Sequence, residues 1–205
     1  MRRLIGLCLA LIATIALAGA PARAAAAPEQ TIQGFYATLL DTMKHAGALG
    51  QKGRYEALAP AIRGSFDLAG MAQMAVGPAW RSFSPEQQQN VAAAFARYTI
   101  ATYADRFDGY GGERLEVTGE RSTQFGTIVQ SRIVKSDGEP ISIDYLMHRQ
   151  GDGWRIADVY LTGTVSQVAA LRSQFVAVLA QHGVEGLIAT LNQKADMLVA
   201  SSAGS

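Results

Sequence analysis

The stretch WRIADVYLTGTVSQVAALRSQF, residues 154–175, decides the fold that the sequence predicts. Apolar side chains fall on both sides of the alternation in residues 154–161, which indicates a strand that is covered on both faces. Gly163 permits a turn, and Thr164 followed by Gln167 three residues later is typical of a capping box at a helix start. The helix that follows carries one apolar stripe. The last strand of a sheet therefore leads into a helix that can fold back over that sheet.

The two sides of this strand have different neighbours. One side carries Trp154, Ile156, Asp158 and Tyr160, and the other carries Ala157, Val159 and Leu161. Either side could line a cavity between the strand and the helix. The side with Val159 and Leu161 is favoured, because Tyr160 shares its side with the carboxylate of Asp158.

Length and composition indicate one domain and exclude one class of partner. The chain has 205 residues, of which 17% are charged, and a net charge of +1. The length predicts about one domain. A net charge so close to zero gives no electrostatic basis for binding nucleic acid.

The first residues are typical of a secretory signal peptide. Arg2 and Arg3 precede an apolar run over residues 4–18, and Ala22-Arg23-Ala24 fits the small-x-small cleavage pattern. The run is shorter than the roughly 20 residues that span a bilayer, which disfavours an uncleaved anchor. We therefore predict a signal peptide over residues 1–24 and an exported domain over residues 25–205.

Two further expectations follow for this domain. Residues 25–30 and 200–205 are expected to be disordered, because they are short terminal segments rich in small residues. The one cysteine, Cys8, lies inside the signal peptide, so the exported chain has no disulfide and depends on its core for stability.

Helical periodicity and capping signals place helices on both sides of a central strand region. Asp67 is a candidate N-cap, and Ser84-Pro85-Glu86-Gln87 combines an N-cap serine, a proline at the first helical position and a capping box. Gly183 separates the last two helices as a C′ residue. The predicted helices cover residues 31–46, 55–62, 68–76, about 85–107, about 165–182 and 184–199.

Between residues 114 and 161 the apolar period changes to that of strands. Ser136-Asp137-Gly138-Glu139 and Gln150-Gly151-Asp152-Gly153 are turn signals between neighbouring strands. Four strands joined by short turns form an antiparallel meander. The fold class predicted is α+β: N-terminal helices, a four-stranded antiparallel sheet, and C-terminal helices folded over the sheet around an apolar cavity.

Motifs for catalysis and metal binding are missing from the sequence. The three histidines have no neighbouring ligands at metal-binding spacing, and no phosphate-binding loop or nucleophile elbow occurs. Asp144, His148 and Asp158 form the best case for an acid–base enzyme. Alternation alone explains Asp144 and His148 as solvent-facing residues, and Asp158 is better explained as a buried carboxylate that accepts structural hydrogen bonds. No enzyme is predicted.

Several motifs, in this order, resemble a known family. They are Arg63-x-Ser65-Phe66-Asp67-Leu68-x-x-Met71 with Gly77 and Trp80, then Thr102-Tyr103-Ala104, Trp154-Arg155-Ile156-x-Asp158-Val159, Arg172-Ser173-Gln174-Phe175 and Gly183-Val184-Glu185-Gly186-Leu187-Ile188. This order resembles the toluene-tolerance/MlaC family of periplasmic lipid-binding proteins over essentially the whole exported chain. Residues 158–166, with Tyr160-Leu161-Thr162-Gly163-Thr164, are more similar to the hopanoid-associated HpnM branch.

The resemblance implies a lipid shuttle that uses no cofactor. Such a protein carries a phospholipid, or a hopanoid in the HpnM branch, between an inner-membrane lipid transporter and an outer-membrane lipoprotein or porin complex. Two other functions remain open from the residues alone: a non-catalytic periplasmic interaction protein, and a small acid–base enzyme on a cone-shaped α+β scaffold.

The predicted lipid site is derived from the apolar stripes. A plain hydrophobic core would show the same stripes, because periodicity does not distinguish a core from a pocket. Residues near the first motif are predicted to form the mouth, and residues on the helices and strands are predicted to line the tail cavity. The mouth set is Met71, Met74 and Trp80, and the lining set is Phe95, Tyr98, Ile143, Tyr145, Met147, Val159, Leu161, Phe175 and Val178.

Overall fold

The computed structural model describes residues 27–200, and the α+β class predicted from the sequence is confirmed. The predicted signal peptide, Cys8 and residues 201–205 lie outside the described residues. The elements, in chain order, are α1 (Pro28–Lys44), α2 (Ala46–Ser65), α3 (Leu68–Val76), the 3-10 helix η1 (Gly77–Ser82), α4 (Pro85–Arg106), β1 (Arg114–Thr123), β2 (Gly126–Val134), β3 (Pro140–Gln150), β4 (Gly153–Leu161), β5 (Val165–Ser166) and α5 (Gln167–Ala200).

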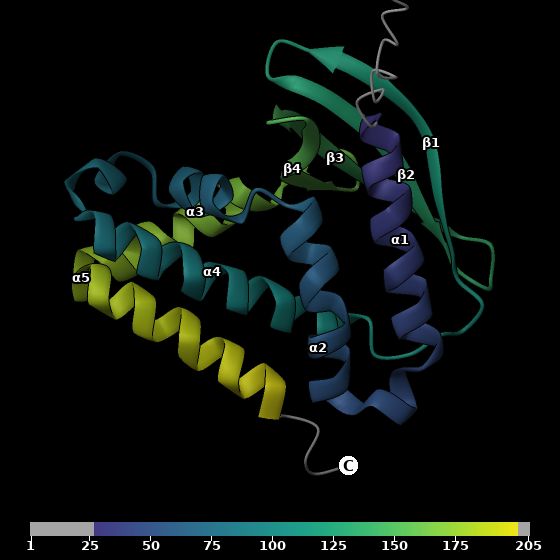
Figure 1. Ribbon diagram of the computed structural model, residues 1–205, viewed down its shortest axis with the longest axis horizontal. Helices are drawn as coiled ribbons and strands as arrows, with labels where there is room; N and C mark the ends of the chain where they lie inside the picture. The colour runs from purple at the N-terminus through teal and green to yellow at the C-terminus, as the bar shows by residue number, and fades with distance from the viewer. Residues whose placement is uncertain (1–26, 201–205) are drawn as a thin grey trace, which may run out of the picture.

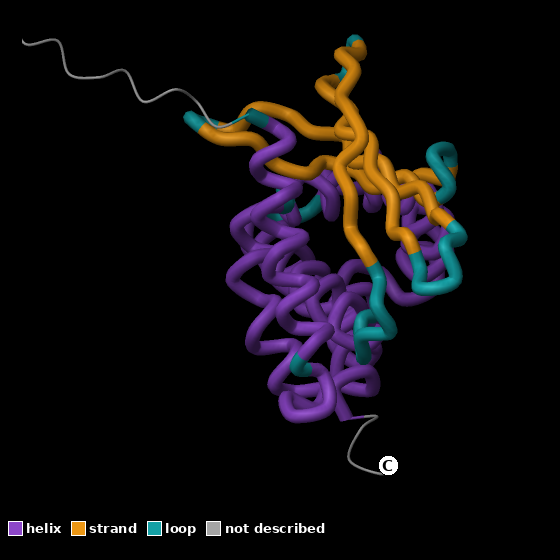
Figure 2. Tube along the Cα trace, turned by 90° about the vertical axis from the view of Figure 1, so that its right-hand side faces the viewer, coloured by secondary structure: helices purple, strands orange, loops and turns teal. Residues whose placement is uncertain are grey.

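Helices and strands form two layers. The strands gather on one side of the molecule and the helices on the other (Figure 2). Helix α1 packs against the sheet, whereas α4 and α5 run side by side away from it, joined to the sheet by the N-terminal part of α5 (Figure 1). Within residues 27–200, no helix is long and apolar enough to cross a membrane.

The sheet is an antiparallel meander in the order β1-β2-β3-β4-β5. The four long strands were predicted, and the two-residue β5 was not. It pairs with the end of β4, where Leu161 lies opposite Val165. Further along β4, the chain before α3 covers the edge, since Phe66 bridges to Ile156 and the amide of Asp67 donates to the carbonyl of Ile156 at 2.9 Å.

A β-bulge in β4 corrects the predicted alternation of this strand. Leu146 of β3 lies opposite Asp158, but the next residue, Met147, lies opposite Ile156, so Ala157 is the extra residue. A bulge inserts one residue and reverses the side on which the residues beyond it point. Ile156 therefore shares the inner, helix-covered face with Val159, and the prediction that it lies beside Asp158 is wrong.

Two predicted helix starts are confirmed and one is wrong. Ser84 forms the complete capping box with Gln87, and Asp67 accepts a hydrogen bond from the amide of Gly70 at 3.0 Å. Helix α5, however, begins at Gln167, because the two residues after Thr164 pair with β4 as strand β5. Its cap is the hydroxyl of Ser166, which accepts from the amide of Ala169 at 3.0 Å.

Other boundaries differ by a few residues from those predicted. Helix α1 begins at Pro28 and α5 extends to Ala200, so the expected disorder is wrong for residues 28–30 and for residue 200. The predicted break at Gly183 is present as a kink inside α5 (φ 65°, ψ −168°), and Gly50 (φ 58°, ψ −178°) kinks α2 in the same way. Both backbones lie in a region that only glycine adopts readily.

Helix α1 is fixed to the sheet by a buried hydroxyl cluster. Tyr36 is hydrogen-bonded to the hydroxyl of Ser131 on β2 at 2.6 Å and to that of Tyr145 on β3 at 3.2 Å. A buried hydroxyl without a hydrogen-bond partner would destabilise the fold. The three hydroxyls avoid this cost because they bond to one another.

A buried arginine fixes the far end of α4. Arg54 on α2 donates from Nε to the carbonyl of Ala104 at 2.8 Å and from a terminal nitrogen to the carbonyl of Ala46 at 3.2 Å. The carbonyl of Ala104 lies in the last turn of α4, and that of Ala46 lies in the first turn of α2 itself. The arginine thereby holds the last turn of α4 in place, which matters because that turn borders the cavity described next.

Candidate functional site

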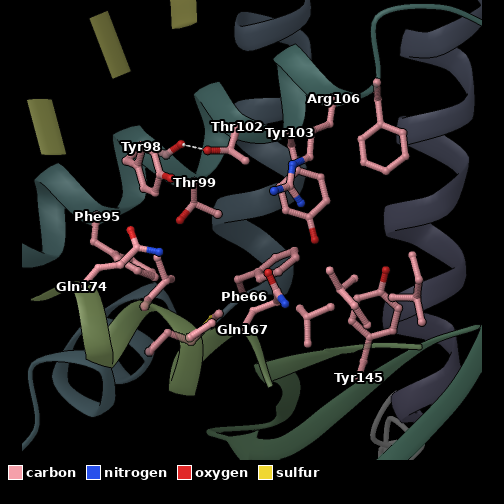
Figure 3. A pocket seen from close by; sticks show the side chains of 17 residues that line it. Phe66, Phe95, Tyr98, Thr99, Thr102, Tyr103, Arg106, Tyr145, Gln167 and Gln174 are labelled. Carbon is pink, nitrogen blue, oxygen red and sulfur yellow. Dashed lines mark hydrogen bonds between the residues drawn. The ribbon is translucent and has the colours of Figure 1, made fainter. Parts of the chain in front are cut away.

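A cavity of about 240 Å³ lies between the inner face of the sheet, α4 and the first turns of α5 (Figure 3). Its walls combine apolar, aromatic and polar side chains from four parts of the chain. The lining residues are Phe66, Met71, Phe95, Tyr98, Thr99, Thr102, Tyr103, Arg106, Phe107, Ile143, Tyr145, Val159, Leu161, Gln167, Ala170, Leu171 and Gln174.

The floor of the cavity is apolar and comes from β3 and β4. Ile143 lies opposite Leu161, and Tyr145 lies opposite Val159, so the four side chains share one face of the antiparallel pair. Residues that face each other in this way have neighbouring side chains. Tyr145 is fully buried, and its ring is held by the hydrogen bond from Tyr36.

Helix α4 supplies one wall through side chains spaced three and four residues apart. Phe95, Thr99, Thr102 and Arg106 follow one another along one stripe, with Tyr103 beside it. Residues at these spacings lie on one face of a helix. The stripe therefore changes from apolar at Phe95 to charged at Arg106, in the last turn of the helix.

Helix α5 supplies the opposite wall with Gln167, Ala170, Leu171 and Gln174. The N-terminus of the helix is held by Asp158 on β4, whose Oδ1 accepts from the amide of Val168 at 3.1 Å. The prediction that Asp158 accepts structural hydrogen bonds is thus confirmed.

A second tether holds α5 against α3. Arg172 donates from Nε to the carbonyl of Met74 at 3.0 Å, and a terminal nitrogen donates to the same oxygen at 2.5 Å. The wall formed by α5 is thus positioned at two points by hydrogen bonds, one to the sheet and one to the last turn of α3.

An aromatic cluster closes one end. The ring of Tyr103 lies edge-on to that of Phe66 at 5.6 Å and stacks on that of Phe107 at 5.7 Å. Burial raises the pKa of Tyr103 and that of Tyr145, because an apolar surrounding disfavours the tyrosinate. Both hydroxyls are therefore neutral hydrogen-bonding groups near physiological pH.

Seven of the twelve residues proposed from the sequence border this cavity, and five do not. Those that border it are Met71, Phe95, Tyr98, Ile143, Tyr145, Val159 and Leu161. Met74 is 37% exposed on the outside of α3, and Trp80 lies in η1. Met147 is buried elsewhere on the sheet. Phe175 packs behind Phe95 with ring centroids 6.3 Å apart, and Val178 lies further along α5. The predicted mouth of Met74 and Trp80 is not at this cavity.

Half of the lining residues that were not predicted are polar, and apolar periodicity does not single out such side chains. Thr99, Thr102 and Arg106 were detectable, since they lie at helical spacing from Phe95. Phe66 and Phe107 stand at the ends of helices and reach the cavity only through the tertiary fold. Contact of any lining residue with a ligand remains a prediction.

The three residues of the enzyme hypothesis are not brought together at this cavity. His148 pairs with Asp67 at 3.1 Å, Asp158 binds the start of α5, and Asp144 lies on the other face of β3. None of them borders the cavity. Within residues 27–200, moreover, no three histidine, cysteine or carboxylate side chains gather closely enough to hold a metal ion.

Comparison with known proteins agrees with this architecture. A solved structure of a phospholipid-binding protein from Ralstonia solanacearum, in complex with a phospholipid, superposes with a TM-score of 0.74 at 24% sequence identity. The match covers 84% of this chain and 99% of that one, which establishes a common fold. The family model described as MlaC protein matches residues 33–193, and the chain therefore belongs to the MlaC family, whose members bind lipid and catalyse no reaction.

Proposed function

We propose that this protein is a periplasmic shuttle that moves a membrane lipid between the inner and outer membranes, with the lipid's apolar chains held in the cavity between the sheet, α4 and α5. The observation that carries the proposal is the composition of that cavity. Its floor is apolar, whereas Arg106 and Gln167 make it polar at the edge where the last turn of α4 faces the first turn of α5 (Figure 3). An amphiphile fits such a gradient, with its chains on the floor and its head group at the polar edge.

The size of the cavity indicates that lipid entry widens it. A volume of about 240 Å³ lies below the roughly 300–1,000 Å³ of typical small-molecule pockets. A two-chain lipid has tens of methylenes and needs more space. Each methylene that leaves water stabilises the complex by about 0.8 kcal/mol, so ten of them contribute about 8 kcal/mol toward opening the walls.

The N-terminal half of α5 is the wall best suited to move. It lies between the turn after β4 and the kink at Gly183. Hydrogen bonds of Asp158 to its first turn and of Arg172 to the carbonyl of Met74 hold it to the sheet and to α3. Hydrogen bonds of this kind contribute about 1 kcal/mol each, less than the burial of a few methylenes. We infer that this half of α5 swings outward as chains enter.

Release requires a partner that stabilises the opened state, since a ligand shifts an equilibrium only by its differential affinity for the two states. The family supports an inner-membrane lipid transporter and an outer-membrane lipoprotein or porin complex as the partners. Two lipid classes are proposed. The Ralstonia solanacearum protein with the same fold holds a phospholipid, which supports a phospholipid, and the similarity of residues 158–166 to the HpnM branch supports a hopanoid.

The proposal is tested by placing a charge in the cavity without unfolding the protein. Tyr145 and Val159 are almost fully buried, so a charge there would disrupt the core. Leu171 is only partly buried, lines the cavity, and lies on the same helix as Val176, which is 54% exposed and does not line it. Leu171→Glu and Val176→Glu are therefore a matched pair.

Delipidated protein is incubated with vesicles of phosphatidylglycerol and phosphatidylethanolamine, recovered, and analysed by native mass spectrometry. We expect wild type and Val176→Glu to carry lipid and Leu171→Glu to carry at least tenfold less, with unchanged circular dichroism. Equal lipid in a folded Leu171→Glu variant would contradict the assignment of this cavity. A wild-type protein that takes up no lipid would instead favour a non-catalytic interaction protein.

A further inference from the structure

The cavity carries one charged side chain. Among its seventeen lining residues, Arg106 is the one cation, and no carboxylate is present. Two glutamines, Gln167 and Gln174, are the other lining residues with side-chain amide donors. A cavity that holds hydrocarbon alone gives this guanidinium no partner, whereas an anionic group of a ligand would pair with it.

The position of Arg106 is that of a residue at an entrance. It stands in the last turn of α4 and is exposed, whereas Phe95, three turns earlier on the same stripe, is buried. Figure 3 shows the guanidinium extending from α4 beside Tyr103 toward the space that Gln167 approaches from the other side. The polar ends of the two helix walls thus meet at one edge of the cavity.

The guanidinium of Arg106 is not committed elsewhere in the described part of the chain. It forms no ion pair with the neighbouring Asp105 or Asp108, and no hydrogen bond to another side chain within residues 27–200. Other arginines are engaged: Arg132 pairs with Glu116 at 2.8 Å, and Arg172 binds the carbonyl of Met74.

Interaction with the C-terminal end of the α4 dipole gives a cation in this turn a modest stabilising role. That role is met equally by a side chain that points into solvent. It does not account for a guanidinium that borders the cavity and faces the space approached by the amide side chain of Gln167 (Figure 3).

We propose that Arg106 binds the phosphate of the lipid head group, with Gln167 as an additional donor (Figure 3), so that the site selects phosphate-bearing lipids over neutral ones. The guanidinium is planar and matches two phosphate oxygens at once, which makes it more selective than a point charge. A hopanoid without phosphate, or a diacylglycerol, leaves this group unpaired. This inference rests on the proposed lipid-binding function, and it favours a phospholipid as the cargo.

The test uses a competition, because a ratio of bound lipids does not depend on how much protein is folded. The variants are Arg106→Gln, which keeps side-chain N–H donors but removes the charge, and Arg106→Lys, which keeps the charge but loses the planar fork. Arg121→Gln is the matched control, since Arg121 is exposed, lies on β1 and does not border the cavity. Mixed micelles offer equal amounts of phosphatidylglycerol and diacylglycerol with identical chains.

Native mass spectrometry then gives the ratio of the two lipids bound. We expect wild type and Arg121→Gln to prefer phosphatidylglycerol, Arg106→Gln to lose about tenfold of that preference, and Arg106→Lys to fall between them. An unchanged ratio in Arg106→Gln, or no preference in wild type, would overturn the role of Arg106 while leaving the shuttle intact. No bound lipid of either kind in wild type would overturn the proposed function and this inference with it.

Discussion

Removing the carboxylate of Asp158 should detach the first turn of α5 from the sheet. The side chain is 7% exposed, and it accepts three hydrogen bonds: from the amides of Val159 at 2.8 Å and Val168 at 3.1 Å, and from the hydroxyl of Ser166 at 2.5 Å. Asp158→Ala removes all three, whereas Asp158→Asn keeps an amide oxygen for the two backbone donors.

The expected loss of stability depends on whether each hydrogen-bond donor can find another partner once the carboxylate is removed. A hydrogen bond to a charged acceptor contributes about 1.5–3 kcal/mol, and a buried donor left unpaired costs about 1–3 kcal/mol. Ser166 is only half-buried, so its hydroxyl can turn to water. The two amides near the core cannot do so as easily. We therefore expect the free energy of unfolding to fall by about 3–5 kcal/mol in Asp158→Ala and by about 1–2 kcal/mol in Asp158→Asn.

Urea unfolding followed by far-ultraviolet circular dichroism measures both values. Asp152→Ala, which removes an exposed carboxylate in the turn before β4, is the control and should change stability by less than about 0.5 kcal/mol. The lipid uptake of Asp158→Asn should match that of wild type, because the residue positions α5 and does not border the cavity. A loss below about 1 kcal/mol in Asp158→Ala, or equal losses in both variants, would refute the reasoning.

Three further predictions concern the backbone, the buried tyrosines and a helix cap. Gly50→Ala and Gly183→Ala should each lower the free energy of unfolding in urea by about 1–3 kcal/mol. The cause is the backbone conformation alone, since a Cβ would meet no atom within 4 Å at either position. Gly34→Ala, at an equally open but helical position, should instead stabilise the protein by about 0.5–1 kcal/mol. Burial raises the pKa of Tyr103, so this group's contribution to the free energy of unfolding should be constant below about pH 10 and fall above it, where the unfolded chain loses the phenol proton first. Tyr103→Phe should reduce the slope of unfolding free energy against pH by up to about 1.4 kcal/mol per pH unit. An unchanged slope would contradict the burial of the phenol. Ser84→Ala should lower stability by about 1 kcal/mol through loss of the α4 cap, and a thermal melt that is unchanged would show that the cap is dispensable.

Local signals in the sequence predicted local structure well. The capping box at Ser84 and the N-cap at Asp67 depend on residues within one turn, so their geometry can be derived from spacing alone. The four long strands and the break at Gly183 follow for the same reason. The α+β class could therefore be predicted from the sequence alone.

Features that depend on a distant partner could not be predicted. The bulge at Ala157 exists because β3 and β4 pair out of step there, and no property of β4 alone indicates that Ile156 points inward. The pattern of Thr164 and Gln167 predicted a helix start, but pairing of β5 with β4 extends the strand past it. Here the tertiary pairing of the two strands outweighed the local capping signal.

The candidate site was predicted in its apolar part. The floor residues Val159 and Leu161 were chosen for the carboxylate on the opposite side of the strand, and they do border the cavity. The polar edge was missed, since Arg106 and Gln167 are recognisable as lining residues only once α4 and α5 enclose the cavity (Figure 3). Membership of the MlaC family does not by itself assign roles to these residues.

Whether a lipid occupies this cavity can be measured by native mass spectrometry of the wild-type protein recovered from its own cells, with solvent extraction of the bound material. We expect one lipid per chain, with phosphorus in its head group, and loss of that lipid in Leu171→Glu but not in Val176→Glu. Protein that is recovered free of lipid, and that takes up none from vesicles, would contradict it.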